Sequence, residues 1–251
     1  MNKIIFEACV DSFESALAAQ NGGADRIELC ADLLEGGITP SAGLIQLVVE
    51  KLKIPVMVMI RPRGGDFLYS ENEFEEMKRD ISIIKNFNPA GFVFGILSED
   101  GTVDKIRTKS LVEAARPLKA TFHRAFDMTR DPLEALDDLI ELGVDRVLTS
   151  GQELDVERGI ETLRKFVEYA GEKIIIMPGG GVNEFNAAEI LKASGAKEIH
   201  ASAREKKESA MKFRNPKTTM SDSSSMPEYE LMVTSEKRVS AIKKIIGQVQ
   251  F

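Results

Sequence analysis

Two pairs of chemically active side chains recur with the same spacing near the N-terminus. Glu7 and Cys9, and then Glu28 and Cys30, are each separated by a single residue. In an extended strand such pairs point to the same side, so each would present a carboxylate beside a thiol. Thiolate ligands, with a thioether such as that of Met59, select Cu(I). The residues thus allow a soft metal site, whereas the alternative is that both cysteines are small buried hydrophobic residues.

The sequence contains two histidines, and each follows a short apolar segment. His123 could take or give a proton near neutral pH. Glu7 and Glu28 are candidates for the partner acid or base, with pKa values set by burial and by nearby charges. The alternative is a structural network in which Glu7, Arg26 and Glu28 pair with one another. His200 could be a second catalytic group or a hydrogen-bonded wall residue.

A glycine triplet follows another apolar segment, in the sequence IMPGGGV. Glycine lets backbone N–H groups approach an anion closely, and a following helix N-terminus adds positive potential. Arginine adds bidentate contacts to phosphate or carboxylate. The alternative is a simple tight turn. The candidate substrate-binding residues are Arg26, Arg61, Arg63, Arg124, Ser150, Gly179, Gly180, Gly181, His200 and Ser202.

Short apolar segments alternate with longer amphipathic segments along the chain. We expect strands at residues 3–9, 26–30, 55–60, 91–94, 119–123, 146–149, 173–177 and 198–201. We expect helices at residues 12–21, 41–53, 71–87, 104–116, 132–142, 155–170, 184–193 and 235–246. Such β–α units require parallel pairing, and eight of them predict a single α/β domain, a (β/α)8 TIM barrel over residues 1–251. An open doubly wound sheet is the alternative, but no G-x-G-x-x-G opens the first helix.

A closed barrel would bring the candidate residues together. The C-terminal ends of its strands meet at one face, where barrel enzymes place their active sites. Both histidines and both carboxylate–thiol pairs lie at the C-terminal ends of predicted strands, and the glycine triplet follows one closely. Barrels commonly bind phosphate after strands seven and eight, where Gly179–Gly181 and Ser202 lie. We therefore expect one polar mouth.

The segment at residues 204–234 interrupts the alternation. It has little periodicity, and loops of this length are usually functional or disordered. Residues 211–216 (MKFRNP) mix aromatic, cationic and apolar side chains and are the better candidate for a lid. For residues 218–228 we expect solvated disorder.

Charge and composition exclude several classes of protein. The formal net charge is −7, which disfavours binding to nucleic acid or to an anionic membrane surface. Two cysteines in 251 residues do not form a disulfide framework and fit a reducing compartment. We find neither a signal peptide nor an apolar segment long enough to span a membrane. These features predict a soluble protein of the cytoplasm.

Several motifs in series resemble the CutC family. They are FEACVDS, GGADRIELC, GGITPSAGL, MIRPRGGDFLYS, TFHRAFD, LTSGQ, IMPGGGV and HASAR, and the resemblance covers nearly the whole chain. It implies a cytoplasmic TIM barrel that binds copper and forms a homodimer or higher homo-oligomer. Cys9 and Cys30 correspond to the cysteines proposed as copper ligands in animal members. The family's motif residues correspond to Glu7, Arg26, Glu28, Arg61, Arg63, His123, Arg124 and Asp127.

These observations support two hypotheses. The first is a copper-homeostasis protein that binds copper as Cu(I) through Cys9 and Cys30. The second is a barrel enzyme, a lyase, isomerase or hydrolase, that acts on a small phosphorylated or carboxylated metabolite. Its substrate clamp would be Arg61 and Arg63. Its catalytic candidates would be Glu7, Glu28, His123 and Asp127. A non-catalytic scaffold is disfavoured because charges buried in a pocket are costly to keep without a use.

Overall fold

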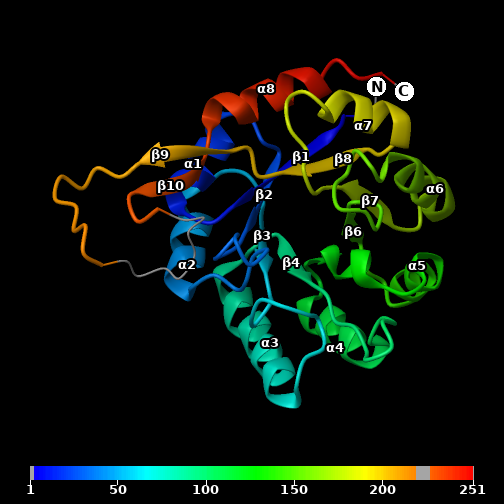
Figure 1. Ribbon diagram of the computed structural model, residues 1–251. Coiled ribbons are helices and arrows are strands. Elements are labelled where there is room, and N and C mark those ends of the chain that lie inside the picture. Colours follow the sequence, from blue (N-terminus) through cyan, green and yellow to red (C-terminus); the bar gives the residue numbers. More distant parts are fainter. Residues whose placement is uncertain (1–2, 219–226, 251) are drawn as a thin grey trace.

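Eight parallel strands surround a common axis, and the helices lie outside them (Figure 1). The structure is a computed structural model, which describes residues 3–218 and 227–250. The ladder order is β7-β6-β5-β4-β3-β2-β1-β8, and β7 also lies against β8. This is a (β/α)8 TIM barrel, as predicted. Its strands are β1 (Ile5–Val10), β2 (Arg26–Leu29), β3 (Val56–Met59), β4 (Gly91–Phe94), β5 (Lys119–Phe122), β6 (Arg146–Thr149), β7 (Ile175–Pro178) and β8 (Glu198–Ala201).

The helices begin where side chains cap free backbone N–H groups. Ser12 and Ser41 each accept a hydrogen bond from the residue three positions on, and Ser70 forms a capping box with Glu73. The helices are α1 (Phe13–Asn21), α2 (Ala42–Lys51), α3 (Glu71–Ile84), α4 (Lys105–Ala115), α5 (Pro132–Glu141), α6 (Ile160–Ala170), α7 (Ala187–Ser194) and α8 (Glu236–Ile246). Two 3₁₀ helices are η1 (Lys85–Phe87) and η2 (Arg124–Met128).

Two helices start later than predicted. The Asp155 carboxylate accepts from the Arg158 N–H in a turn before α6, and asparagine side chains make a similar turn before α7. Short polar side chains compete in this way with helical hydrogen bonds.

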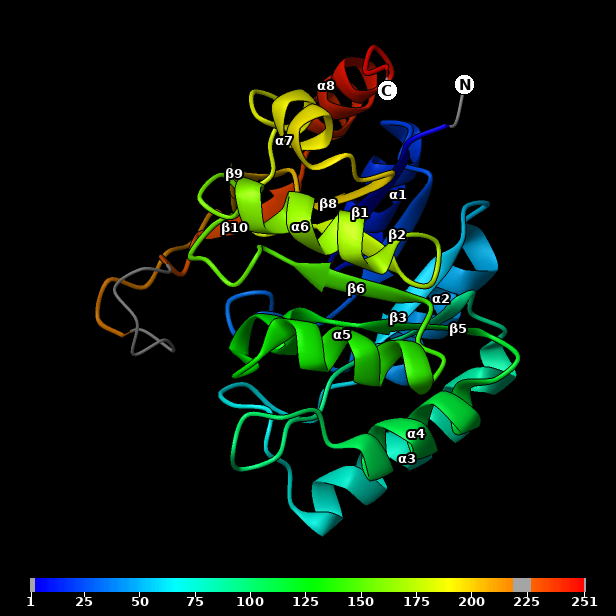
Figure 2. The same ribbon diagram turned by 90° about the vertical axis from the view of Figure 1, so that its right-hand side faces the viewer.

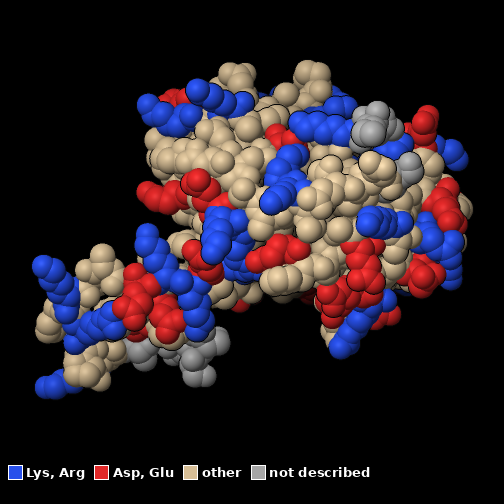
Figure 3. All heavy atoms as spheres, turned by 90° about the horizontal axis from the view of Figure 1, so that it is seen from above, with Lys and Arg blue, Asp and Glu red and all other residues tan. Residues whose placement is uncertain are grey.

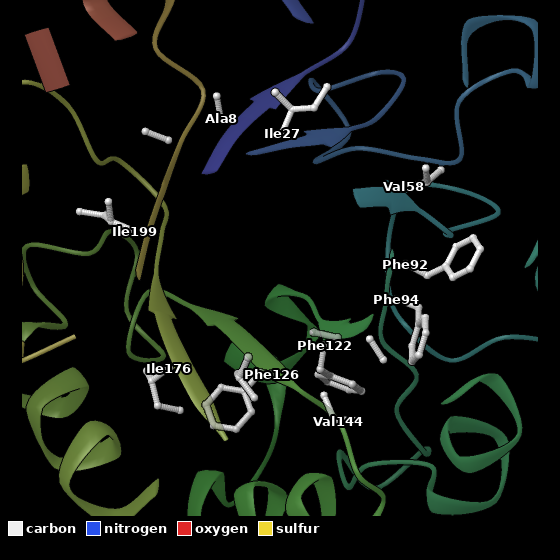
Figure 4. Packing of buried hydrophobic residues seen from close by; sticks show 14 of the residues in the cluster. Ala8, Ile27, Val58, Phe92, Phe94, Phe122, Phe126, Val144, Ile176 and Ile199 are labelled. Carbon is white, nitrogen blue, oxygen red and sulfur yellow. The ribbon is translucent and has the colours of Figure 1, made fainter. Parts of the chain in front are cut away.

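The apolar core lies between the strands and the helices. Figure 4 shows side chains such as Val58, Phe92 and Ile199 on the side of their strands that faces the helices. Neighbouring residues in each strand point the other way, into the barrel. Figure 2 shows α5 and α6 lying along the outside of the barrel wall. The outward face is therefore apolar, and the inward face is free to carry polar groups.

A charged layer fills the inside of the barrel. The Arg26 guanidinium donates from Nε to Glu7 and from Nη2 to Glu198. Arg146 donates from Nε to Glu198 at 2.5 Å and from Nη1 to Thr121 Oγ1 at 3.1 Å. All four charged side chains are buried. Each charge faces an opposite charge, which is the condition for burying it.

A two-stranded antiparallel ribbon extends from the barrel after β8. It pairs β9 (Arg204–Glu208) with β10 (Glu230–Thr234) and projects to one side in Figures 1 and 2. We predicted an irregular loop here, so that part of the prediction was wrong. The disorder expected for residues 218–228 falls largely on residues 219–226, which lie outside the described residues. The lid candidate at residues 211–216 is exposed.

The outer surface mixes charges of both signs. Figure 3 shows acidic and basic side chains interspersed over the face it presents and along the projecting ribbon. Within residues 3–218 and 227–250, no helix is both long and apolar enough to cross a membrane.

The buried charged layer yields a stability prediction. Glu198→Gln removes the carboxylate charge that offsets Arg26 and Arg146, so we expect a loss of about 3–5 kcal/mol in the free energy of unfolding, measured by urea titration. The matched control is Glu161→Gln, whose carboxylate forms an exposed pair with Arg164 and should change stability by less than about 0.5 kcal/mol. Equal effects of the two substitutions would contradict this interpretation of the layer.

Candidate functional site

A cavity of about 630 Å³ opens at the C-terminal ends of the strands. Its walls come from the ends of β1, β2, β3, β5, β6, β7 and β8 and from the loops that follow them. The predicted residues that line it are Cys9, Glu28, Arg61, His123, Arg124, Asp127, Gly180, Gly181, His200 and Ser202. The predicted mouth is therefore a real cavity, and its two sides differ in chemistry.

One side holds the two thiols and a carboxylate. Cys9 Sγ lies 3.9 Å from Cys30 Sγ, and Cys30 Sγ lies 3.6 Å from Glu28 Oε2. One ligand atom from each of these three buried residues lies within 4.8 Å of the others. Met57 and Met59 belong to the same small cluster of buried side chains as the two cysteines. We call Cys9, Glu28 and Cys30 the thiol site.

His200 connects the thiol site to the charged layer below it. Its Nδ1 lies 2.9 Å from Glu7 Oε1, and its Nε2 lies 3.6 Å from Glu28 Oε2. Burial opposes a charged imidazole, but Glu28, Cys9 and Glu7 together raise the pKa of His200 well above its usual value. Burial likewise opposes a charged Glu7, yet Arg26 and His200 lower the pKa of Glu7. An imidazolium therefore stands between two carboxyl groups.

The three groups of the thiol site differ in the direction in which their pKa values are shifted. Burial, followed by the neighbouring Cys9, raises the pKa of the Glu28 carboxyl well above its usual range. The hydrogen bond from Cys30 and the charge of His200 hold the pKa of Cys9 well below its usual range. The same contact with Cys9, together with burial, raises the pKa of Cys30. Cys9 is thus the more readily ionised thiol.

The wall beside the thiol site, after the end of β3, holds a buried cation. Arg61 donates from Nη1 to the carbonyl oxygens of Glu35 and Gly37 and from Nη2 to that of Gly65. Its side chain is 4% exposed, and its Nε has no partner among the described residues. No carboxylate within residues 3–218 and 227–250 forms an ion pair with it. Three backbone dipoles therefore hold a charge that lacks a counter-ion.

His123 lies near this arginine as a neutral hydrogen-bond donor. Its Nδ1 accepts from the Ala125 N–H at 3.1 Å, so the proton of the neutral ring sits on Nε2. Burial, reinforced by the charge of Arg61, lowers the pKa of His123 to about 3. This value disagrees with our expectation of proton exchange near neutral pH. The buried Nε2 finds no partner in the described part of the chain.

Asp127 holds the loop after β6 through several hydrogen bonds. Because these contacts occupy both of its carboxylate oxygens, little room remains for a substrate to bind there. It accepts from the backbone N–H groups of Ser150 and Gln152, from Thr149 Oγ1, and from Arg124 Nε at 2.7 Å. We predicted a catalytic role for Asp127, but these contacts fit a positioning role better. Arg124 Nη2 also donates to Ser150 Oγ at 2.9 Å, which fixes its guanidinium beside the glycine triplet.

The glycine triplet approaches this guanidinium closely. A Cβ atom at Gly180 would lie 3.1 Å from Arg124 Cζ, and the φ of Gly180 is +98°. A side chain here would be strained and would crowd the arginine. Glycine is therefore required at position 180 by its backbone conformation and by the nearby Arg124 side chain.

Arg63 does not belong to the cavity, contrary to our prediction of a two-arginine clamp. It pairs with Glu73 at 2.6 Å and with Asp66 at 3.0 Å, and its guanidinium packs over the ring of Tyr69. It braces the loop between β3 and α3. The other predicted residues outside the cavity lining are Glu7, Arg26, Cys30, Ser150 and Gly179.

Several lining residues were not predicted. Phe67 packs 5.0 Å from both the His123 ring and the Arg61 guanidinium, measured to the ring centroid of Phe67. Arg204 and Arg238 reach the cavity from β9 and α8. Phe67 and Arg204 lie within the motifs MIRPRGGDFLYS and HASAR, which was the available signal.

The state of His123 can be measured directly, because the chain has only one other histidine. At pH 5 an ordinary histidine, with a pKa near 6.5, would be mostly protonated. We expect His123 to stay neutral with its proton on Nε2, because its pKa lies at about 3. Nitrogen chemical shifts of ¹⁵N-histidine protein, assigned with His123→Asn, test this, and an imidazolium pattern for His123 at pH 5 would contradict the assignment.

Sequence comparisons place this chain in a known group of proteins. A model of the CutC family matches residues 4–205. The human copper homeostasis protein cutC homolog is 51% identical over 99% of this chain and 91% of its own length. The family protein CutC of Mesorhizobium japonicum is 47% identical over 94% of this chain and 92% of its own length.

Solved structures agree with the sequence comparison. A Streptococcus agalactiae structure that carries the CutC name is 33% identical, with a TM-score of 0.76 over 79% of this chain and 98% of its own. Phosphoribosylanthranilate isomerase from Pyrococcus furiosus, at 14% identity and a TM-score of 0.58 over 98% of this chain and all of its own, shows the shared fold alone. The chain described here belongs to the CutC family.

Proposed function

We propose that this protein binds copper as Cu(I) at the thiol site, as part of copper homeostasis. The observation that carries the proposal is the approach of Cys9 Sγ and Cys30 Sγ to 3.9 Å beside Glu28. Metal–thiolate bonds are about 2.3 Å long in zinc sites, so one ion could bridge sulfur atoms at this separation. The name of the human relative, a copper homeostasis protein, points to the same metal.

The donor atoms suit a soft ion. Two thiols, with Met59 in the same buried cluster, offer sulfur ligands, which select Cu(I) over hard cations. Cys9, the thiol with the lowered pKa, lines the cavity, whereas Cys30 lies behind it and is fully buried. An incoming ion would therefore meet the more readily ionised ligand first.

The proposal also includes the cellular compartment and the oligomeric state of the protein. Two cysteines that are free in the structure fit a reducing compartment such as the cytoplasm. Assembly into a homodimer or a larger homo-oligomer, which the family resemblance implies, stays a prediction.

A second candidate function is catalysis on a small phosphorylated or carboxylated metabolite. It is favoured by the pairing of Glu28 and His200 at the cavity wall, because both pKa values are strongly raised there. Perturbed acid–base groups in a cleft are typical of enzyme active sites. In this candidate Glu28 and His200 would exchange the proton, and His123 would donate a hydrogen bond.

The copper proposal is tested by removing both thiols. We expect the Cys9→Ser/Cys30→Ser variant to lose more than about 100-fold in Cu(I) affinity, because losing an outer-shell partner alone already costs metal sites about 10–100-fold. The measurement is an anaerobic competition titration against a chromophoric Cu(I) chelator, with circular dichroism to verify the fold.

Met128→Leu is the matched control for this titration. Its thioether also lines the cavity but is 67% exposed, so its loss should leave the Cu(I) affinity unchanged. A double serine variant that binds Cu(I) as tightly as the parent protein would refute the thiol site.

A further inference from the structure

The wall of the cavity at the ends of β3 and β5 holds polar atoms that nothing in the copper proposal uses. Arg61 and His123 line the cavity, are each 4% exposed, and carry an Nε and an Nε2 without a partner in the described residues. Both atoms are donors, since arginine has no acceptor and the His123 Nδ1 already accepts from Ala125. Unpaired buried donors are rare in folded proteins and need a partner.

The positive charge of Arg61 determines what kind of ligand could pair with these donors. Arg61 is a buried cation held only by carbonyl dipoles, and residues 3–218 and 227–250 supply no carboxylate to pair with it. Arg204 lines the cavity from β9, it forms no ion pair among those residues, and its buried Nε is also unpartnered. A neutral ligand would leave the charge uncompensated, whereas an anion would offset it.

We propose that this corner binds a small organic oxyanion, a carboxylate or a phosphate ester, whose oxygen accepts from Arg61 Nε and His123 Nε2. The ring of Phe67 packs against both side chains and covers the two donors. The ligand oxygen reaches them when that ring turns aside. We call Arg61, Phe67 and His123 the oxyanion corner.

The rest of the ligand would extend toward the glycine triplet. The backbone N–H groups of Gly180, Gly181 and Val182 form no hydrogen bond within the described part of the chain, and all three residues line the cavity. The unpartnered Oε1 of Glu28 lies on the remaining wall, where it would meet a ligand hydroxyl. A volume of about 630 Å³ accommodates a small metabolite.

The inference does not depend on copper binding. It deepens the second candidate function by naming the side chains that would bind the anionic group of the ligand, yet it holds for a binding site without catalysis. Its test uses copper-free protein, so failure of the thiol site and failure of the oxyanion corner would be seen in separate experiments.

The test follows the His123 Nε2–H signal in ¹⁵N-histidine protein at pH 7. The probes are glycolate for the carboxylate arm and inorganic phosphate for the phosphate arm, with sodium chloride at equal ionic strength as the reference. We expect a saturable shift with at least one oxyanion and none with chloride. The probe that saturates at lower concentration identifies the ligand class.

Variants of the two arginines near β3 sharpen the test. Arg61→Gln should weaken binding at least about tenfold, whereas Arg63→Gln, the matched control outside the cavity, should bind like the parent protein. If Arg61→Gln does not fold, Arg61→Lys keeps the charge but lacks the Nε–H beside His123, and it should still bind several-fold more weakly. No saturable shift, an equal shift with chloride (an adventitious ion only), or parental affinity in the folded Arg61 variant would overturn the proposal.

Discussion

The salt-bridged layer inside the barrel is the interaction on which the site depends. Arg26 stands between Glu7 and Glu198, and Arg146 shares Glu198 from the far side of the barrel. Most barrels fill this space with branched apolar side chains. Here the layer fixes Glu7 as a carboxylate, and Glu7 in turn holds His200 as an imidazolium above it. The protonation of the thiol site therefore follows from charges that are buried inside the barrel.

The cavity above this layer combines a site for a soft metal ion with a site for an anion. The thiol site offers soft sulfur donors beside the His200 imidazolium, whereas the oxyanion corner offers hydrogen-bond donors and the charge of Arg61. Within the thiol site, Glu28 has one oxygen facing His200 and Cys30, and its other oxygen is unpartnered. A copper carrier needs only the first side. In the oxyanion corner, burying the unpaired charge of Arg61 lowers the stability of the fold. An anionic ligand would offset that charge, and this is the physical reason to assign a ligand to the corner.

Much of this arrangement could be predicted from the sequence, because strand alternation is rigid. Glu7 with Cys9 and Glu28 with Cys30 point inward as predicted, since each pair lies on or at the end of a strand. The predicted clamp of Arg61 and Arg63 failed at Arg63, because β3 ends at Met59 and Arg63 lies in the loop that follows, outside the cavity lining. The ribbon was missed because β9, with the sequence REKKE, has no apolar period and is paired only through β10. The low pKa of His123 could not be predicted from the sequence, because its burial and its proximity to Arg61 arise only in the folded chain.

The most direct test of the account is copper-edge X-ray absorption on the protein loaded anaerobically with one equivalent of Cu(I). Cys9 and Cys30 lie 3.9 Å apart at the end of the charged layer, so the account predicts a first coordination shell with two sulfur scatterers. That shell should be lost in the Cys9→Ser/Cys30→Ser variant. A shell of nitrogen and oxygen alone in the parent protein would contradict the account, because it would place the copper away from the only two thiols of the chain.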